Sequence, residues 1–448
     1  MDWSSTCSYL CIDQGVTMAT APGARPLHTA GKPSIGILLR LMLPFGFGYY
    51  LSHVYRSVNA VIAPDLVRSI GLGAADLGLL TSAFMLAFAL AQLPLGVLLD
   101  RYGARRVDVA LLLLAVMGAL LFAVSESVLV LAVGRALMGL GVAACMMAAF
   151  KSMTMVLPIS WLMPAQGLLV AVGGVGAMTA TAPAETLVRL FGWRSVFVLL
   201  ATATVIAAVC VYLFVPDEEA RVRRRTSWRR EMAGLKRALL HPFFLAVGPA
   251  IGLVQGGFIA IQTLWAGPWL YYVVGLDSTT VSHYLLLIAC GMVGGYVFNG
   301  FLGAVVIRWG VSPIVIAIVG SAIMLLSLAL IILLGPLVPL PIWIVFGFFG
   351  TSVVVCFAMI GQQVPGRFVG RVSTAVNFMT FATAFVFQWG IGAMVQFWTP
   401  DTGGHYPDSA FKFAFTVTLS VQAAGLVILA LSGVRMHQAR RQHVSMDT

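Results

Sequence analysis

Three polar residues in an apolar segment near the N-terminus share one face of a predicted helix. His53, Arg56 and Asn59 are spaced by three residues, which places their side chains on one side of an α-helix. An arginine near the middle of a membrane span costs about 2.5–3.5 kcal/mol and normally faces a cavity with an anionic partner. No carboxylate lies at the centre of an apolar segment. The pattern predicts that Arg56 binds an external anion; the alternative is an arginine that reaches the membrane surface and pairs with Asp65 or Glu185.

Two further groups of polar residues could contact a solute. The first group is Gln262 and Trp265. It precedes the pair Gly267-Pro268, which we expect to break a helix, and discontinuous helices often line binding sites. The second group is Asn377 and Gln388, which are eleven positions, or three helical turns, apart and therefore share a helix face. Interhelical hydrogen bonds explain such residues as readily as solute contacts do. The predicted substrate-binding residues are His53, Arg56, Asn59, Gln262, Trp265, Asn377 and Gln388.

A short charged loop carries a different pattern, G-x-x-x-D-R-x-G-x-R-R, between Gly96 and Arg106. Its glycines, Gly96 and Gly103, would let the chain reverse direction within a few residues. Asp100 lies on the last turn of the incoming helix, where a carboxylate is unfavourable against the helix dipole. We therefore expect Asp100 to have a partner on another element.

Composition indicates an integral membrane protein. Of 448 residues, 60% are hydrophobic and 10% are charged, whereas about a quarter of the residues of a soluble domain are charged. Apolar runs of about 20 residues, each long enough to span the bilayer as a helix, recur along the chain. We expect twelve transmembrane helices: Ile35–Ile62, Leu77–Leu99, Val107–Val124, Val128–Phe150, Met163–Leu187, Val196–Val215, Phe243–Gly267, Tyr284–Val306, Pro313–Leu334, Pro341–Ile360, Val372–Val395 and Phe413–Leu431.

The basic residues predict the orientation of these helices. With both termini in the cytoplasm, most of the 27 Lys and Arg fall on cytoplasmic segments. The four assigned to the outside are Arg68, Arg189, Arg194 and Lys412. Because positive charge is retained on the cytoplasmic side, this distribution supports a multi-pass inner-membrane protein. The net charge of +11 is then an orientation signal with attraction to anionic lipid, and we expect no nucleic-acid partner.

A long polar stretch divides the chain into two halves that each hold six runs. The charged loop has a second copy 207 residues later, where Gly303, Arg308 and Gly310 repeat the spacing and Ile307 replaces the aspartate. The expected organisation is a cytoplasmic leader 1–34 with a natural start at Met18, a six-helix bundle 35–215, a basic linker 216–242, a second bundle 243–434 and a cytoplasmic tail 435–448.

The loop pattern resembles the signature of the major facilitator superfamily, the large group of 12-helix solute carriers. Two further stretches are similar to its motifs: Arg135-x-x-x-Gly139-x-Gly141, and Gly192-Trp193-Arg194 with Phe197. The resemblance implies an all-α membrane protein of two pseudo-symmetric six-helix bundles that expose a central site alternately to each side. It also implies a latch between Asp100 and the helix that starts near residues 370–373, and a buried structural or coupling role for Arg135. The predicted gating residues are Gly96, Asp100, Arg101, Gly103, Arg105, Arg106, Arg135 and Gly139.

Other classes of site find little support. The six cysteines have no metal-ligand spacing, and no phosphate loop of the Walker type is present. No cluster of His, Asp, Ser and Cys occupies one helix face as catalysis would require. We expect no cofactor, no metal and no enzymatic activity, and we expect a monomer whose partners are a small-molecule substrate and membrane lipid.

These observations predict a secondary-active or facilitative transporter, with uptake of an organic anion favoured. A neutral aromatic solute such as a flavin-like vitamin is the first alternative, because Trp265 is aromatic and central carboxylates are missing. A multidrug or metabolite efflux pump is the second, although the Gly-Pro pairing of drug/proton antiporters is absent between Gly167 and Pro183. A transporter-like membrane sensor is an alternative of another class. Both facilitated diffusion and proton symport through His53 remain open.

The orientation predicts which positions a membrane-impermeant thiol reagent reaches in intact cells. Cysteines introduced at Glu126 and Asp277 should be labelled above the background of the unsubstituted chain, because both positions lie in external loops. A cysteine at Arg225 should be labelled only after the cells are permeabilised. Labelling at Arg225 in intact cells would contradict the assignment.

Overall fold

The structure is a computed structural model that describes residues 34–157, 159–216, 234, 237, 239–308, 312–356, 366–400 and 406–446. Within these residues every regular element is helical. The predicted leader and nearly all of the predicted basic linker lie outside the described residues. The elements are α2 Ile35–Ser57, α3 Asn59–Ile70, α4 Ala74–Tyr102, α5 Ala104–Val124, α6 Val128–Gly141, α7 Cys145–Val156, α8 Ile159–Thr179, α9 Ala182–Phe214, α11 Pro242–Ala260, η1 Ile261–Trp265, α12 Ala266–Pro268, η2 Trp269–Val273, α13 Ser278–Arg308, α14 Pro313–Leu334, η3 Gly335–Leu337, α15 Leu340–Phe349, η4 Ser352–Val355, α17 Gly366–Val395 and α18 Asp408–Met446.

The apolar runs form long helices. Among the described residues, ten helical stretches are long and apolar enough to cross a membrane, and two apolar helices, Ala165–Thr179 and Leu340–Val355, are shorter. Each stretch overlaps a run expected from the sequence. The chain is therefore an all-helical, multi-pass membrane protein.

Several predicted boundaries are wrong. The first run is not one helix, because α2 ends at Ser57 and α3 begins at Asn59. The predicted helix Met163–Leu187 ends instead at Thr179, and its last residues belong to α9. Proline is favoured in the first helical turn because it lacks only an N–H that has no intrahelical partner there. Pro183 therefore marks the start of α9, a sequence signal that the long apolar run obscured.

The helix that follows the linker is not broken at Gly267-Pro268, contrary to the prediction. The chain instead continues through two π-helical turns, η1 and η2, on either side of α12. A π-turn widens the helix locally and often marks a functional site. A Cβ at Gly267 would overlap the carbonyl oxygen of Ala60 in α3, so the glycine permits a close approach between two helices.

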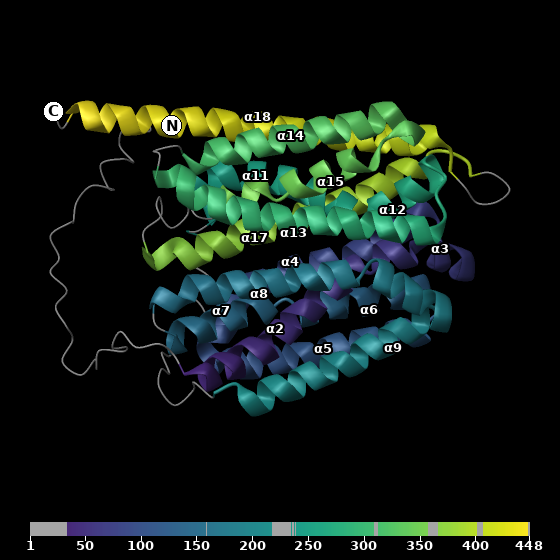
Figure 1. Cartoon of the computed structure of the whole chain (residues 1–448), viewed down its shortest axis with the longest axis horizontal. Helices are drawn as coiled ribbons and strands as arrows, with labels where there is room; N and C mark the ends of the chain where they lie inside the picture. Colours follow the sequence, from purple (N-terminus) through teal and green to yellow (C-terminus); the bar gives the residue numbers. More distant parts are fainter. Residues whose placement is uncertain are drawn as a thin grey trace.

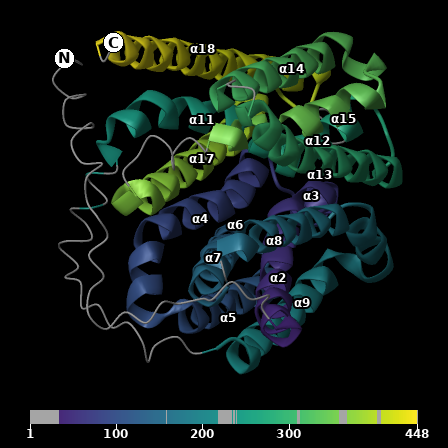
Figure 2. The ribbon, with the colours of Figure 1, turned by 60° about the vertical axis from the view of Figure 1, so that its left-hand side comes forward.

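The helices of residues 35–214 lie on one side of the molecule and those of residues 242–446 on the other (Figures 1 and 2). Helix α4 packs along α17, α8 packs against α13, and α3 packs against α12 and η1. Glycines allow the closest approaches, since a Cβ at Gly78 would meet the carbonyl oxygen of Gln388 at 2.9 Å. These contacts join the two parts of the chain.

The two parts are held together most closely at the end of the molecule that contains α3. At this end, on the right in Figure 1, the backbone N–H of Ala74 contacts the hydroxyl of Tyr406 at 3.5 Å. The Thr279 hydroxyl likewise donates to Glu185 at 3.5 Å. Helix α2 begins and α18 ends at the opposite end (Figure 1). Both of these hydrogen bonds between the two parts lie at the α3 end.

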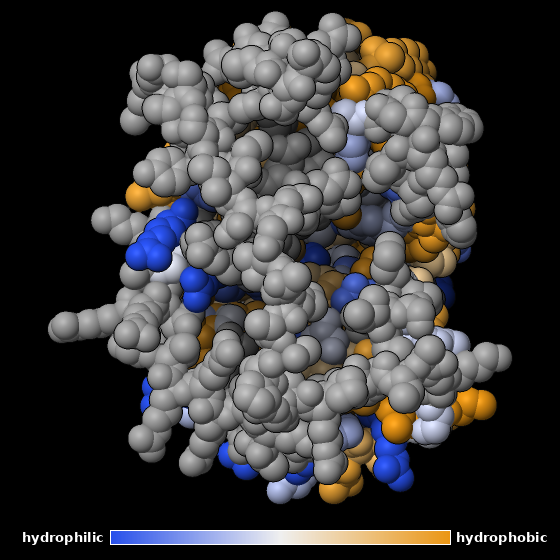
Figure 3. All heavy atoms as spheres, turned by 90° about the vertical axis from the view of Figure 1, so that its left-hand side faces the viewer, coloured by the Kyte–Doolittle hydropathy of each residue, from blue (hydrophilic) through white to orange (hydrophobic). Residues whose placement is uncertain are grey.

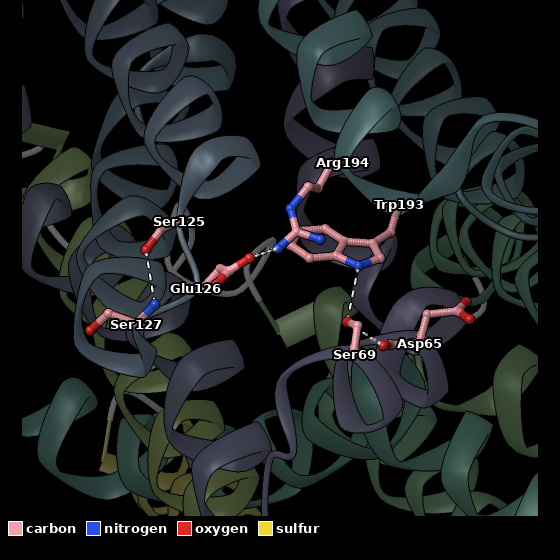
Figure 4. A network of polar contacts seen from close by, with 7 residues as sticks. All are labelled: Asp65, Ser69, Ser125, Glu126, Ser127, Trp193 and Arg194. Atoms are coloured by element: carbon pink, nitrogen blue, oxygen red, sulfur yellow. Dashed lines mark hydrogen bonds and ion pairs between the residues drawn. The ribbon is translucent and has the colours of Figure 1, made fainter.

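A polar network covers part of the same end (Figure 4). The Trp193 indole donates to Ser69 at 3.2 Å, and Ser69 donates to the carbonyl oxygen of Asp65 at 2.6 Å. Arg194 pairs with Glu126 at 3.5 Å and lies over the Trp193 ring. The carboxylate of Asp65 points away from these contacts (Figure 4). The network ties α3 and the α5–α6 connection to α9.

Glycines also determine packing inside the N-terminal part. A Cβ at Gly139 in α6 would overlap the carbonyl oxygen of Phe84 in α4. Gly96 lies within α4, and a Cβ there would meet no atom within 4 Å. The two glycines belong to different predicted motifs. A side chain at Gly139 would push α6 and α4 apart, whereas a side chain at Gly96 would meet nothing.

This difference predicts opposite effects of alanine on stability. Gly139→Ala should lower the melting temperature of the detergent-solubilised protein, because overpacking costs about 1–3 kcal/mol. Gly96→Ala, the matched control, should leave it unchanged or raise it slightly, because alanine favours the helix by about 0.5–1 kcal/mol. Equal melting temperatures for the two variants would contradict the helix contact.

Candidate substrate-binding site

The site is centred on one face of α2. His53 and Arg56 lie within its last two turns and are half-buried. Helix α2 packs against α8, α9 and α7 and also contacts η1. The two polar side chains therefore lie inside a helical assembly, and their partial exposure indicates open space beside them.

Two aromatic rings contact the Arg56 guanidinium. Its Cζ atom lies 4.9 Å from the ring centroid of Phe88 in α4 and 4.7 Å from that of Phe381 in α17. The two ring centroids are 4.4 Å apart, and both residues are buried. A cation over a desolvated aromatic face gains about 2 kcal/mol or more. The rings thus stabilise the charge from both parts of the chain.

Tyrosine and histidine side chains complete the surroundings of Arg56. The ring centroids of Tyr49 and His53 are 4.6 Å apart, edge to face, and the His53 Nδ1 atom lies 3.3 Å from the carbonyl oxygen of Tyr49. A Cβ at Gly173 in α8 would overlap both rings, so glycine is required there. Tyr296 of α13 is close enough to Arg56 to interact with it electrostatically. Tyrosines from both parts of the chain therefore lie within electrostatic range of Arg56.

Arg56 has no counter-charge within the described part of the chain. None of the described acidic side chains forms an ion pair with it, and its Nε atom is buried without a hydrogen-bond partner. The proposed alternative partners lie elsewhere, since Glu185 accepts from Thr279 and Asp65 is in the α3 network. The arginine is thus an uncompensated positive charge between the two parts.

Asn59, the third residue of the predicted face, is placed differently. Its side chain is fully buried and donates to the Thr81 hydroxyl at 3.0 Å. Val58, the one residue between α2 and α3, keeps right-handed helical dihedral angles. The Asn59 side chain joins α3 to α4 through its hydrogen bond to Thr81.

Three of the other predicted substrate-binding residues, Gln262, Trp265 and Gln388, lie in η1 or bond to it. The Trp265 indole donates to the carbonyl oxygen of Gln388 at 3.0 Å, and Gln388 donates to Thr263 at 2.8 Å. Both Trp265 and Gln388 are buried, so these bonds attach η1 to α17. Gln262 is buried and Asn377 is half-buried. Helix α2, which carries Arg56, contacts η1.

Sequence reasoning missed the aromatic contacts of Arg56. Phe381 lies four residues after Asn377 and seven before Gln388, so it shares their helix face. That spacing is a signal that could have identified it. Phe88 has no comparable signal, because phenylalanine is common in apolar helices and its contact with Arg56 depends on how α4 packs against α2.

The charged loop between α4 and α5 turns at one glycine. Gly103 has φ 82°, a left-handed conformation that glycine adopts without strain. The expectation that Gly96 also forms the turn is wrong, because α4 continues to Tyr102. Arg105 donates to the carbonyl oxygen of Val215 at 3.3 Å and so connects the loop to the end of α9.

The remaining gating predictions have different outcomes. Arg101 lies over the Tyr102 ring at 5.4 Å, and Arg106 is exposed and has an interaction partner. The Asp100 side chain and the side chains of residues 366–370 lie outside what the structure describes, so the predicted latch stays a prediction. In the second copy of the loop, the side chains of residues 303–308 and all of residues 309–310 likewise lie outside what the structure describes.

Arg135 is fully buried inside the N-terminal part. Its Nη1 atom donates to the carbonyl oxygen of Tyr55 at 2.9 Å, and its Cζ atom lies 4.9 Å from the Phe84 ring centroid. The Tyr55 hydroxyl contacts Thr204 at 2.9 Å. Arg135 therefore connects α6 to α2 and α4, and Tyr55 extends the connection to α9.

Figure 3 views the end of the molecule opposite α3, where described residues of hydrophilic and hydrophobic character are visible near the middle of the face. The close contacts between the two parts lie at the other end. A site between the two parts that is closed at one end is the arrangement of a membrane carrier.

The comparison with known families agrees with this class. The profile of the Major Facilitator Superfamily matches residues 45–388, so the chain belongs to this superfamily. Its members are transporters that act on small molecules within the membrane, and the protein is not an enzyme.

Individual relatives are more distant. The chain is 28% identical over 178 residues to the probable sulfoacetate transporter SauU of Cupriavidus necator, across 39% of this chain and 41% of that protein. It is 24% identical to the putative transporter AraJ of Escherichia coli, across 61% and 66% of the two chains. The matches thus span less than two thirds of either relative. The crystal structure of the nucleoside transporter NupG superposes with a TM-score of 0.68 at 13% identity, covering 88% of this chain and 98% of that one.

Proposed function

We propose that this protein carries a small organic anion across the bacterial inner membrane by alternating access, with uptake as the favoured direction. Arg56 binds the acidic group of the substrate. The observation that carries the proposal is the uncompensated charge of Arg56, half-buried between the two parts of the chain and without an acidic partner among the described residues. An anionic substrate would supply the missing counter-charge.

The surroundings of Arg56 support this choice of substrate. A guanidinium presents a planar fork of N–H donors that matches a carboxylate or another oxyanion. Tyr49 and Tyr296 add hydroxyl groups from α2 and α13. One relative is named as a probable transporter of sulfoacetate, which is an organic anion. A cationic solute would be repelled by the same arginine.

The proposed architecture is the twelve-helix form of the superfamily. The ten candidate spans and the two shorter apolar helices would together give twelve crossings, six in each bundle. The distribution of basic residues favours cytoplasmic termini. With this orientation the α3 end faces outward and is closed, so the site would face the cytoplasm. We propose that the protein acts as a monomer in the lipid bilayer.

Substitution of Arg56 tests the substrate charge in proteoliposomes. The probes are radiolabelled sulfoacetate, succinate and glycerol 3-phosphate, compared with the neutral solutes uridine and xylose. The wild type should take up at least one anion. Arg56→Lys should retain weak uptake, because lysine keeps the charge and loses the planar fork. Arg56→Gln should lower uptake about ten- to hundredfold, as expected for losing hydrogen bonds to a charged group.

Two other patterns would contradict the proposal. Near-normal anion uptake by Arg56→Gln would show that the charge does not bind substrate. Uptake of uridine or xylose that tolerates Arg56→Gln and fails in Gln262→Ala or Trp265→Ala would favour a neutral solute. The amount of folded protein in the liposomes is measured for each variant, so that a loss of uptake is compared at equal protein.

A further inference from the structure

The aromatic pair Phe88–Phe381 contacts Arg56 from both parts of the chain. Phe88 belongs to α4, in the same part as Arg56, whereas Phe381 belongs to α17, in the other part. The exposed fractions of the two residues are 6% and 5%, so little water reaches the faces that meet the guanidinium. The rings therefore interact with the charge in a desolvated environment, where cation–π attraction is strongest.

An uncompensated arginine raises a problem for any alternating-access carrier. After the substrate leaves, the protein must change conformation without the anion in order to start a new cycle. A charge enclosed in an apolar interior without a counter-charge opposes that change. A carrier with no remedy can only exchange one substrate anion for another across the membrane.

We propose that the aromatic pair stabilises the Arg56 guanidinium when no anion is bound, so that the unloaded carrier changes conformation and carries out net transport. This inference rests on the proposed function, in which Arg56 binds the substrate anion. The two interactions use different sites of the guanidinium: a ring attracts the positive charge through its face, while the N–H groups around the edge bind an oxyanion. The rings therefore do not need to leave when the anion binds.

The two rings have different parts in this scheme. Phe88 and Arg56 lie in one part of the chain, so their contact is kept when the two parts move relative to each other. The contact with Phe381 depends on how α17 lies against α4, so it stabilises the unloaded arginine in the arrangement described here, from which an imported anion leaves. Neither phenylalanine carries a charge, so both leave the arginine free to bind an anion when one returns.

Two flux measurements in the same proteoliposomes test the inference. Net uptake is measured into liposomes that contain no substrate, and exchange is measured into liposomes loaded with the unlabelled anion. The probe is whichever of sulfoacetate, succinate and glycerol 3-phosphate the wild type transports fastest. The ratio of net uptake to exchange does not depend on the amount of active protein, so partial misfolding of a variant does not affect it.

The variants are Phe88→Leu, Phe381→Leu and the double substitution. Each single substitution should lower the ratio of net uptake to exchange, and the double variant should lower it at least about tenfold, because leucine fills the space without an aromatic face. Phe381→Tyr should keep the wild-type ratio of net uptake to exchange, since tyrosine keeps the aromatic ring. The matched control is Phe385→Leu, four residues further along α17 and half-buried, which should leave the ratio unchanged.

An unchanged ratio in the double variant would overturn the inference while the proposed function stands. A reduced ratio in Phe385→Leu of the same size would also overturn it, because the effect would then belong to the helix and not to the aromatic contact. Normal transport by Arg56→Gln, or no transport of any of the three anions by the wild type, would instead overturn the proposed function and this inference with it.

Discussion

The account depends on one electrostatic constraint, a positive charge enclosed between two parts of an apolar protein. Arg56 has aromatic rings, tyrosines and a histidine around it and no acidic partner among the described residues. In water such a charge would be solvated at no cost, whereas in the membrane interior it must be stabilised by specific groups. The identity of those groups explains both the proposed substrate and the proposed behaviour of the unloaded carrier.

The surrounding fold determines how that charge is presented. Glycines bring helices into close contact at the α3 end and within the N-terminal part, as Gly267 and Gly139 illustrate. Arg135 lies in the N-terminal part, where it bonds to a backbone carbonyl and meets the Phe84 ring. The two arginines differ in their environment: Arg135 is fully buried and attached to its own part, whereas Arg56 is half-buried and touches a ring from each part.

Much of the fold could be predicted from sequence because membrane spans are long apolar runs with few charges. The turn at Gly103 was also predictable from local sequence, because glycine adopts a positive φ without strain. The interruption at Val58 and the π-turns around Gly267 were not, since tertiary contacts influence where a helix bends or ends, whereas Pro183 marks the boundary between α8 and α9 in the sequence. For the site, helical spacing puts His53 and Arg56 on one face of α2, but it does not reveal the hydrogen bond between Asn59 and Thr81 of α4. The contacts of Phe88 and Phe381 with Arg56 depend on packing between distant helices, which spacing within one helix does not reveal.

Ligand-induced stabilisation tests the central claim, that Arg56 binds the anion, without requiring transport. A ligand at a hundredfold excess over its Kd stabilises a folded protein by about 2.7 kcal/mol, which raises the melting temperature of a chain of this size by about 3 °C. The account predicts such a shift for the detergent-solubilised wild type with at least one of sulfoacetate, succinate and glycerol 3-phosphate, and none with uridine or xylose. It predicts that the same anion gives no shift with Arg56→Gln. An equal shift in the wild type and Arg56→Gln would contradict the claim.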